Sequence, residues 1–318
     1  MFVCSMSIAT EQVYTLEDLK NWPPSAAEFP ASGTALGVIG HPIAHSLSPA
    51  MHNAALEQLA KTNPKFSDWR YFKFDIAPEE LGRALRLFSK NNFLGLNLTV
   101  PHKMLALDYI FPDAATVEDA GAANTLKFIE NRWHGYNTDG YGLRQALNDQ
   151  SVNINAADVL ILGAGGAARA AALECLAGGC ASLQIHNRTR STVDIMIGHL
   201  KKSTAYNPFT KLTSFNPGDS GLCANAIVIN ATSLGLKEND KSPLELKEIP
   251  RPAFVFDMIY RPSQTRLLKQ AAEMGIPNAN GLAMLVHQGA QSLRQWTEND
   301  SVPVDVMRQA VHHALNAY

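Results

Sequence analysis

Apolar and polar residues fall into blocks along the chain, and the spacing within the blocks changes in a regular order. TALGVIG (34–40) is almost continuously apolar and WRYFKFDI (69–76) alternates, so both predict strands. PAMHNAALEQLAK (49–61) and PEELGRALRLFSK (78–90) place apolar residues at helical spacing, and FLGLNLTV (93–100) again predicts a strand. Strands that alternate with helices in this way predict a mostly parallel sheet covered by helices.

The alternation starts again near residue 141, after two short β-like stretches at 123–130 and 132–137. ADVLILGAGGAARAAALECLA (157–177) indicates a strand, a glycine turn and a helix. Three more strand-like stretches follow, at 181–189, 226–236 and 253–260, and helical periodicity returns over 282–318. The pattern therefore predicts an α/β protein with two domains.

Composition narrows the class of protein. The 318 residues carry a formal net charge of -2, which argues against a protein that coats nucleic acid, because such a protein needs a basic face. The four cysteines form no CxxC pair, and no run of about 18 apolar residues occurs that could span a membrane. Because a basic signal region is also missing, we expect a cytoplasmic protein with reduced thiols.

The glycine turn has the spacing of a dinucleotide-binding site. Gly163 allows the tight turn after the strand, Gly165 lets a pyrophosphate approach the backbone, and the small Ala168 lets the helix pack on the sheet. The free N–H groups at the helix start would bind the phosphates. A glycine-rich packing turn is the alternative, but the flanking strand and helix favour a dinucleotide.

The end of the next strand bears on which dinucleotide binds. An NAD-specific fold usually places an acidic residue there, whereas this chain has Asn187, Arg188, Thr189 and Arg190. A guanidinium can bind a 2′-phosphate with two hydrogen bonds, so the sequence favours NADP. An ordinary surface arginine is the alternative explanation.

The segment HSLSP predicts an anion site at a helix start. Ser48 precedes Pro49, so we expect Ser48 to be the N-cap of the helix, and Ser46 can point the same way. Two hydroxyls beside a helix N-terminus suit a carboxylate, although a simple cap would use the same residues. A metal site at the nearby histidines is disfavoured, because Pro42 disrupts their helical spacing and no acidic ligand is close.

Further polar residues follow the third strand. Asn97 and Thr99 share one face of that strand, and Lys103 lies just past its carboxyl end, where open α/β sheets bind their ligands. Asn124 and Asp139 lie in turn-like contexts. Each residue has an ordinary structural explanation, but together they suit a polyhydroxylated carboxylic acid.

These motifs resemble the shikimate dehydrogenase family. In order over about 33–300 they are HSLSP, NLTVPHK, AANT, NTDGYG, GAGGAAR, NRT, NATSLG, DMIY and NGLAMLVHQ. The resemblance implies reversible NADPH-dependent reduction of 3-dehydroshikimate to shikimate, on the route to chorismate and aromatic amino acids. It implies a small-molecule substrate. Net charge, the lack of a long apolar run and the histidine spacing predict no nucleic acid, membrane or metal partner, and we also expect a homodimer.

The resemblance also assigns roles to residues. The substrate carboxylate would be held by Ser46 and Ser48, and the ring hydroxyls by Asn97, Thr99, Asn124 and Asp139, with Tyr260 and Gln288 completing the pocket. Lys103 would be the catalytic lysine, paired with Asp139, either transferring the proton or chiefly positioning the substrate. The cofactor would be bound by Gly163, Ala164, Gly165, Gly166, Ala167, Asn187, Arg188, Thr189, Thr232, Met258 and Gly281.

The domains follow from the same resemblance. We expect an extension over 1–32, a substrate-binding domain over 33–140 completed by the C-terminal helices of 282–318, and a Rossmann-type NADP-binding domain over 141–281. The extension has no counterpart in the family pattern.

Several positions depart from that pattern. Thr192 stands where the family often has a second basic residue, for which Arg190 would have to substitute. Ala283 replaces a usual glycine and Ala123 a usual valine. The alternatives are a quinate/shikimate dehydrogenase using NAD, a catalytically idle NADP-sensing relative and, less well matched, a methylene-tetrahydrofolate dehydrogenase.

Overall fold

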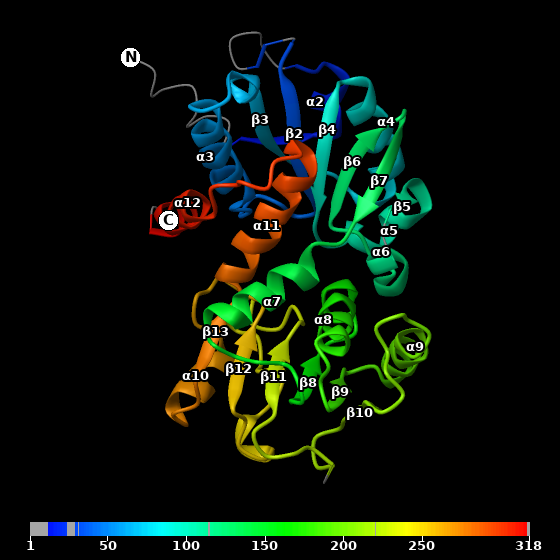
Figure 1. The fold of residues 1–318 in the computed structure, drawn as a ribbon, viewed down its shortest axis with the longest axis vertical. Coiled ribbons are helices and arrows are strands. Elements are labelled where there is room, and N and C mark those ends of the chain that lie inside the picture. Colours follow the sequence, from blue (N-terminus) through cyan, green and yellow to red (C-terminus); the bar gives the residue numbers. More distant parts are fainter. Residues whose placement is uncertain (1–11, 24–28, 31, 114, 220, 317–318) are drawn as a thin grey trace. The chain divides into compact units, whose positions relative to one another are not determined.

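The computed structural model describes residues 12–23, 29–30, 32–113, 115–219 and 221–316. The chain divides into two compact units: unit 1 runs to Thr138 and resumes at Gln288, and unit 2 is Asp139–His287. Both are α/β, as the sequence pattern predicts (Figure 1). The helix α11 (Leu282–Thr297) therefore contributes residues to both units.

Unit 1 is built on a seven-stranded sheet. Its strands, in spatial order, are β1 (Val13–Thr15), β3 (Trp69–Asp75), β2 (Thr34–Gly40), β4 (Phe93–Leu98), β6 (Thr125–Ile129), β7 (Arg132–Tyr136) and β5 (Phe111–Pro112). The first four are parallel, and β6 runs antiparallel to β4 and β7. The mostly parallel sheet is thus confirmed, with an antiparallel hairpin added to it.

Helices of unit 1 come from both ends of the chain. They are α2 (Leu16–Lys20), α3 (Ser48–Ala60), α4 (Leu81–Lys90), α5 (His102–Leu105), α6 (Ala115–Ala120) and α12 (Val304–Asn316), with short 3-10 turns at Pro64–Phe66, Pro78–Glu80 and Ala106–Tyr109. The helix α12 packs against α3 (Figure 1). Trp296, near the end of α11, donates from its indole Nε1 to the Leu126 carbonyl at 2.9 Å. The C-terminal helices therefore return to unit 1, as expected.

The N-terminal extension is part of this unit, which the sequence did not reveal. Its residues Leu16–Lys20 form α2, and the preceding Val13–Thr15 form β1, an edge strand parallel to β3. The Tyr14 ring packs on Trp22, Phe72 and Phe74 at centroid distances of 5.3, 5.8 and 5.6 Å. Apolar burial thus holds the segment onto the sheet. Within the extension, residues 1–11, 24–28 and 31 lie outside the described residues.

Unit 2 has a six-stranded parallel sheet with helices around it. Its strands, in spatial order, are β10 (Lys211–Ser214), β9 (Ser182–His186), β8 (Asp158–Leu162), β11 (Ile227–Asn230), β12 (Phe254–Asp257) and β13 (Asn278–Asn280). The helices are α7 (Asp139–Asp149), α8 (Gly166–Ala177), α9 (Arg190–Leu200), α10 (Arg266–Glu273) and the start of α11, with a 3-10 turn at Leu246–Glu248. This is the strand order of the dinucleotide-binding fold, with its switch point between β8 and β11.

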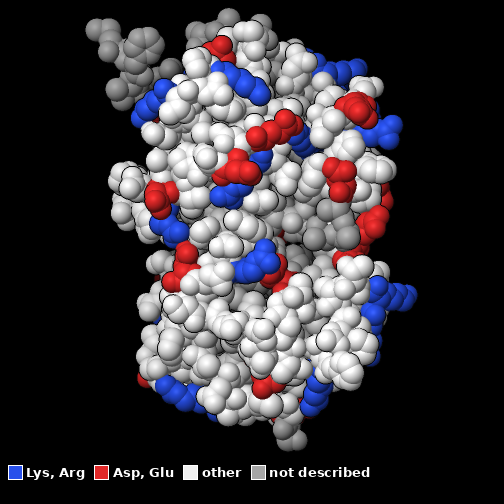
Figure 2. Space-filling model, viewed as in Figure 1, with Lys and Arg blue, Asp and Glu red and all other residues white. Residues whose placement is uncertain are grey.

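Charged side chains of both signs are interspersed on the face drawn in Figure 2. Among the described residues, no helix combines the length and the apolar character needed to cross a membrane.

Candidate active site

The loops that follow β2 and β4 lie side by side at the carboxyl edge of the unit 1 sheet. The Thr99 amide donates to the Ile39 carbonyl at 2.9 Å, and the His41 amide donates to the Val100 carbonyl at 3.1 Å. A Cβ on Gly40 would lie 2.6 Å from the Thr99 Cγ2 atom and 2.7 Å from the Ile43 Cδ1 atom, so a larger residue would force these side chains to shift. The arrangement brings the HSLSP segment toward Thr99.

The two serines stand at the start of α3, but not as predicted. The N-cap is Leu47, whose φ of -89° and ψ of -3° are already helical, so Ser48 is the first residue of the helix and the predicted Ser48 cap is wrong. Ser46 instead accepts the Ser48 amide at its Oγ atom, at 3.3 Å. Ser48 is buried and Ser46 half-buried. Both hydroxyls still lie at the positive end of a 13-residue helix, as a carboxylate site needs.

Asn124 and Gln288, both expected to contact substrate, meet inside unit 1. The Asn124 amide Nδ2 donates to the Gln288 Oε1 atom at 3.2 Å and to the Thr138 hydroxyl at 2.9 Å. The Thr138 amide donates to the Asn124 Oδ1 atom at 2.8 Å. These bonds fix the orientation of the Asn124 side chain, which is 2% exposed.

Asn97 is the centre of a second buried network. Its Nδ2 group donates to the Asn124 carbonyl at 3.1 Å, the Thr125 hydroxyl at 3.1 Å and the Ser292 hydroxyl at 3.0 Å. Its Oδ1 atom accepts from the Tyr71 hydroxyl at 2.7 Å. Tyr71 and Ser292 were missed from the sequence, although Ser292 lies one helical turn after Gln288 and therefore on the same face of α11.

The expected catalytic residues fall in different units. Lys103 is half-buried on α5 in unit 1, where its carbonyl accepts the Ala123 amide at 2.8 Å and so ties the AANT segment to α5. Asp139 begins α7 in unit 2 and is 4% exposed. Tyr260 follows β12 in unit 2, and burial raises the pKa of its hydroxyl above the usual value. The pairing of Lys103 with Asp139 stays a prediction.

The glycine turn of unit 2 has the geometry of a phosphate site. Gly163 has a φ of +114°, which favours glycine, and a Cβ there would lie 3.0 Å from the Ala231 carbonyl oxygen. Gly165, by contrast, caps α8 at an ordinary φ of -84°, and a Cβ there would meet no atom within 4 Å. Since no described residue requires glycine at 165, the open space in front of its backbone fits a bound pyrophosphate.

A buried carboxylate organises the loops after β11 and β12. The Asp257 Oδ1 atom accepts from the Asn230 Nδ2 group at 3.0 Å and from the Ile259 amide at 3.0 Å. The Asn230 Oδ1 atom in turn accepts from the Thr232 hydroxyl at 2.8 Å. Burial raises the pKa of the Asp257 carboxyl, and these donors and Thr265 oppose that rise. The network therefore positions the loop that carries Thr232.

Met258 and Gly281 lie against each other beside that network. A Cβ on Gly281 would lie 2.0 Å from the Met258 carbonyl oxygen, so no other residue fits there without a backbone shift. The Gly281 amide donates to the Ile259 carbonyl at 3.1 Å. Both predicted cofactor residues are thus held at the carboxyl end of β12.

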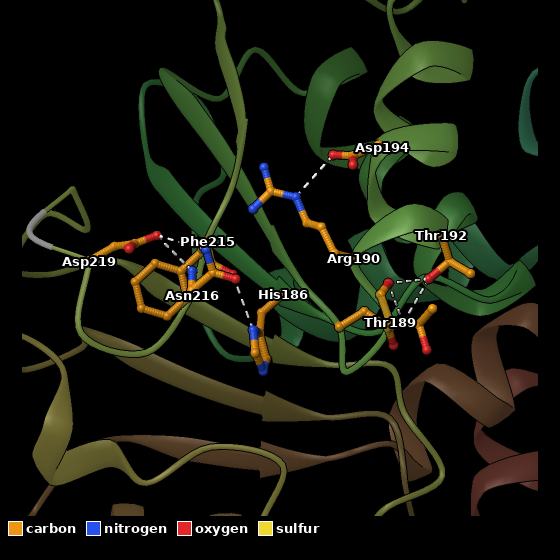
Figure 3. Close-up of polar contacts among 9 residues, drawn as sticks. His186, Thr189, Arg190, Thr192, Asp194, Phe215, Asn216 and Asp219 are labelled. Atoms are coloured by element: carbon orange, nitrogen blue, oxygen red, sulfur yellow. Dashed lines mark hydrogen bonds and ion pairs between the residues drawn. The ribbon is translucent and has the colours of Figure 1, made fainter.

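The NRT turn after β9 is braced by its own helix (Figure 3). The Asn187 Nδ2 group donates to the Thr192 hydroxyl at 2.8 Å. The Thr192 hydroxyl in turn donates to the Thr189 carbonyl at 2.6 Å. Arg190 donates from Nε to Asp194 at 3.0 Å, so its charge is partly compensated. Arg188 is exposed and, within the described part of the chain, forms no hydrogen bond or ion pair. Arg188 is therefore better placed than Arg190 to receive a 2′-phosphate.

Two family models match the chain: the shikimate dehydrogenase substrate binding domain over residues 38–126, and the shikimate 5'-dehydrogenase C-terminal domain over residues 281–312. The NADP(+) shikimate dehydrogenase of Symbiobacterium thermophilum is 39% identical over 289 residues, covering 89% of this chain and 95% of the relative. The chain belongs to the shikimate dehydrogenase family.

Solved structures of similar proteins share the fold. The shikimate 5-dehydrogenase of Thermus thermophilus, in complex with NADP(H) and shikimate, has a TM-score of 0.77 and 32% identity, covering 88% of this chain and 99% of that one. The 5-ketofructose reductase of a Gluconobacter species has a TM-score of 0.74 and 30% identity, covering 88% of this chain and 98% of that one. The fold alone therefore does not fix the substrate.

The histidines of the HSLSP region lie in different surroundings. His52 is fully buried and its ring stacks on that of Tyr71, with centroids 4.2 Å apart and planes 7° apart. Burial lowers the pKa of His52 to about 3, so the ring is neutral at physiological pH. His41 pairs with Asp75 at the surface. Among the described residues, no group of three potential metal ligands is found.

Proposed function

We propose that this protein is an NADP-dependent shikimate dehydrogenase, which reversibly reduces 3-dehydroshikimate to shikimate. The observation that carries the proposal is the 39% identity over 289 residues with an NADP(+) shikimate dehydrogenase. By family analogy, the reaction belongs to the route toward chorismate and aromatic amino acids.

Unit 1 would bind the substrate. The Ser46 and Ser48 hydroxyls at the start of α3 suit a carboxylate, which accepts hydrogen bonds and is stabilised by a helix N-terminus. Asn97, Asn124 and Gln288 offer neutral amides suited to ring hydroxyls. Thr99 of unit 1, together with Asp139 and Tyr260 of unit 2, completes the proposed set.

Unit 2 would bind NADP, since the open space before Gly165 fits a pyrophosphate and Arg188 suits the 2′-phosphate. The proposed contacts are the turn of residues 163–167, Asn187, Arg188, Thr189, Thr232, Met258 and Gly281. When bound, NADPH supplies the hydride that the carbonyl carbon of 3-dehydroshikimate receives.

Lys103 would bind the carbonyl oxygen of 3-dehydroshikimate. A lysine side chain is ordinarily an ammonium at neutral pH, so it can donate a hydrogen bond to the oxygen and stabilise the negative charge that develops there. Transfer of one proton to that oxygen completes the reduction to an alcohol, and in the reverse direction the proton returns. Asp139 would orient the ammonium and accept from the neighbouring hydroxyl.

Two other interpretations make different predictions. A quinate/shikimate dehydrogenase would also oxidise quinate, often with NAD, and would need room for an extra hydroxyl next to the carboxylate at Ser46 and Ser48. An idle NADP-binding relative would bind the cofactor without turnover; Lys103 and Asp139 speak against it. The related 5-ketofructose reductase adds 5-ketofructose as a substrate to test.

The direct test of the proposal is product identification. Purified protein incubated with 3-dehydroshikimate and NADPH should yield shikimate, separated by chromatography and identified by mass, in equal amount to the NADPH consumed. NADPH consumption with 5-ketofructose but not with 3-dehydroshikimate would overturn the proposal. The homodimer and the cytoplasmic location stay predictions, and light scattering tests the first.

A further inference from the structure

Lys73 is a charged residue buried inside unit 1. It lies on β3 between Phe72 and Phe74, and only 4% of it is exposed. Alternation along the strand places it on the same face as Tyr71, whose ring stacks on His52 of α3. Lysine is almost never buried to this degree unless its amino group has a partner. A lysine at this position therefore calls for a specific polar contact.

One such contact joins Lys73 to the loop between β2 and α3. The Lys73 Nζ group donates a hydrogen bond to the Ala44 carbonyl at 3.1 Å. Ala44 is a central residue of a four-residue turn, which is closed by the Ser46 amide donating to the Ile43 carbonyl at 2.9 Å. Strand β3 therefore holds this turn through the side chain of Lys73.

The same turn carries the first serine of the proposed carboxylate site. Ala44 and Ser46 are two residues apart, so their Cα atoms are separated by at most about 7 Å. The Ser46 Oγ atom accepts the Ser48 amide at 3.3 Å, which links the turn to the first residue of α3. A shift of the Ala44 carbonyl would therefore move the Ser46 hydroxyl relative to Ser48.

A second contact from β3 holds the start of the loop. Asp75, two residues after Lys73 and on the same face of the strand, pairs with the exposed His41. The His41 amide is also bonded to the Val100 carbonyl, at 3.1 Å. The loop is thus attached to β3 at its first residue and at its turn, and Lys73 makes the attachment nearer to the serines.

Donation to one loop carbonyl does not by itself need a charged group. A neutral donor could satisfy the Ala44 carbonyl, whereas the Lys73 ammonium also places a positive charge beside the turn. In the protein interior such a charge attracts a nearby anion more strongly than it would in water. A buried ammonium at this turn therefore favours a carboxylate at the serines over a neutral group.

We propose that Lys73 is a positioning residue for the substrate carboxylate: through the Ala44 carbonyl it fixes the turn that carries Ser46, and it sets the preference of the serine site for a carboxylate. This inference rests on the proposed function, which assigns the substrate carboxylate to Ser46 and Ser48. In this scheme Lys73 acts through the loop and contacts neither NADP nor the reacting carbonyl.

The first test is Lys73→Met, which keeps an unbranched side chain of similar length and removes the ammonium. Apolar replacement of a buried charged group is often tolerated, so the variant should fold. The shikimate KM should rise about tenfold, the loss expected for one hydrogen bond from a charged group, while kcat and the NADP+ KM change by less than about twofold. A shikimate KM that does not rise, or that rises together with the NADP+ KM, would overturn the proposal.

Lys127→Met is the matched control, because Lys127 is also a buried lysine on the unit 1 sheet. Its ammonium pairs with Glu298 at 2.6 Å, and it lies on β6 rather than beside the serine loop. Lys127→Met should keep the wild-type shikimate KM even if it lowers the melting temperature. Equal rises of the shikimate KM in both variants would show that losing a buried lysine weakens unit 1 in general, which would overturn a specific role for Lys73.

A change of ligand separates an effect on the carboxylate from a general effect on the pocket. The methyl ester of shikimate is neutral at the group that Ser46 and Ser48 would bind, and its inhibition constant is measured against shikimate oxidation. The wild type should bind the ester more weakly than shikimate. In Lys73→Met this preference should fall at least about fivefold, and in Lys127→Met it should be unchanged. Proportional losses for both ligands in Lys73→Met would contradict the proposal.

Lys73→Arg is a second variant, which keeps a charged donor at the same position. Its preference for shikimate over the methyl ester should stay within about threefold of the wild-type value, even where the larger guanidinium raises both constants. If Lys73→Arg loses the preference as fully as Lys73→Met, the charged donor is not its cause. A wild type that neither binds nor oxidises shikimate would instead overturn the proposed function.

Discussion

The ring of His52 stacks on the ring of Tyr71 with a centroid separation of 4.2 Å, inside the unit that carries HSLSP. No hydrogen-bond partner for either ring nitrogen is found among the described residues. A protonated imidazole would be costly here, since burial alone lowers the pKa of His52 to about 3 from an ordinary 6.5.

This relationship predicts acid sensitivity. The unfolded chain binds one more proton at His52 than the folded chain between pH 6.5 and pH 3, so the free energy of unfolding falls as pH falls through that window. His52→Phe keeps a flat ring but cannot be protonated. Between pH 7.5 and pH 5, its free energy of unfolding in urea should therefore fall by about 2 kcal/mol less than that of the wild type. His45→Gln, an exposed control, should follow the wild type. If the difference in the free energy of unfolding between the wild type and His52→Phe does not change with pH, protonation of His52 is not the cause of the acid sensitivity.

Substitution by alanine should have different effects at two glycines of unit 2: one should weaken NADP+ binding and the other should lower stability. Gly165→Ala places a methyl group where no protein atom lies within 4 Å, so stability should change by less than about 0.5 kcal/mol while the NADP+ KM rises at least about tenfold. Gly281→Ala would place Cβ 2.0 Å from the Met258 carbonyl and should cost about 1–3 kcal/mol of stability. Thermal unfolding and cofactor kinetics of both variants separate the effects; a destabilised Gly165→Ala with normal NADP+ binding would mean that the glycine serves packing.

Cofactor preference should depend on Arg188 more than on Arg190. Arg188→Gln should raise the NADP+ KM about 10- to 100-fold and leave the NAD+ KM unchanged, because only NADP+ carries the 2′-phosphate. Arg190→Gln is the matched control and should have a smaller effect, since Asp194 already binds the Arg190 guanidinium. The reverse order of effects would show that Arg190 binds the phosphate.

Lys103→Met should depress turnover more than binding. Removing the ammonium that stabilises the developing alkoxide should lower kcat about 10²–10⁴-fold and change the shikimate KM only a few-fold. Lys90→Met on the exposed end of α4 serves as control and should keep wild-type kinetics. If kcat/KM falls mainly through KM, Lys103 binds substrate without assisting the chemistry.

The sequence predicted those features that depend on local patterns. The long strands and helices were visible as changes of periodicity, and the glycine turn was visible because Gly163 and Gly165 have fixed spacing. The short strands β1, β10 and β13 were not, since VYT, KLTS and NAN contain no run of three apolar residues, whereas the equally short β11 and β12 contain the runs IVI and FVF. The Ser48 cap failed because the serine–proline pattern does not reveal that Leu47 already has helical dihedral angles.

The contacts that shape the site were the least visible in the sequence. Asn97 meets Ser292, 195 positions later, and Tyr71, 26 positions earlier. Nothing in the neighbouring residues of Tyr71 marks its hydroxyl as part of a polar network, because an inward tyrosine on a strand is usually taken as apolar core. Such pairings arise from tertiary packing, so only the structure reveals them.

The most direct measurement is the nicotinamide absorbance change of the purified protein with shikimate or quinate and NADP+ or NAD+, in all four pairings. We expect fast reduction of NADP+ with shikimate and no reduction in the other three pairings. Activity with quinate and NAD+ would contradict the proposed carboxylate site and the role of Arg188. No activity in any pairing, with NADP+ still bound, would contradict the enzymatic function and favour an NADP-sensing relative.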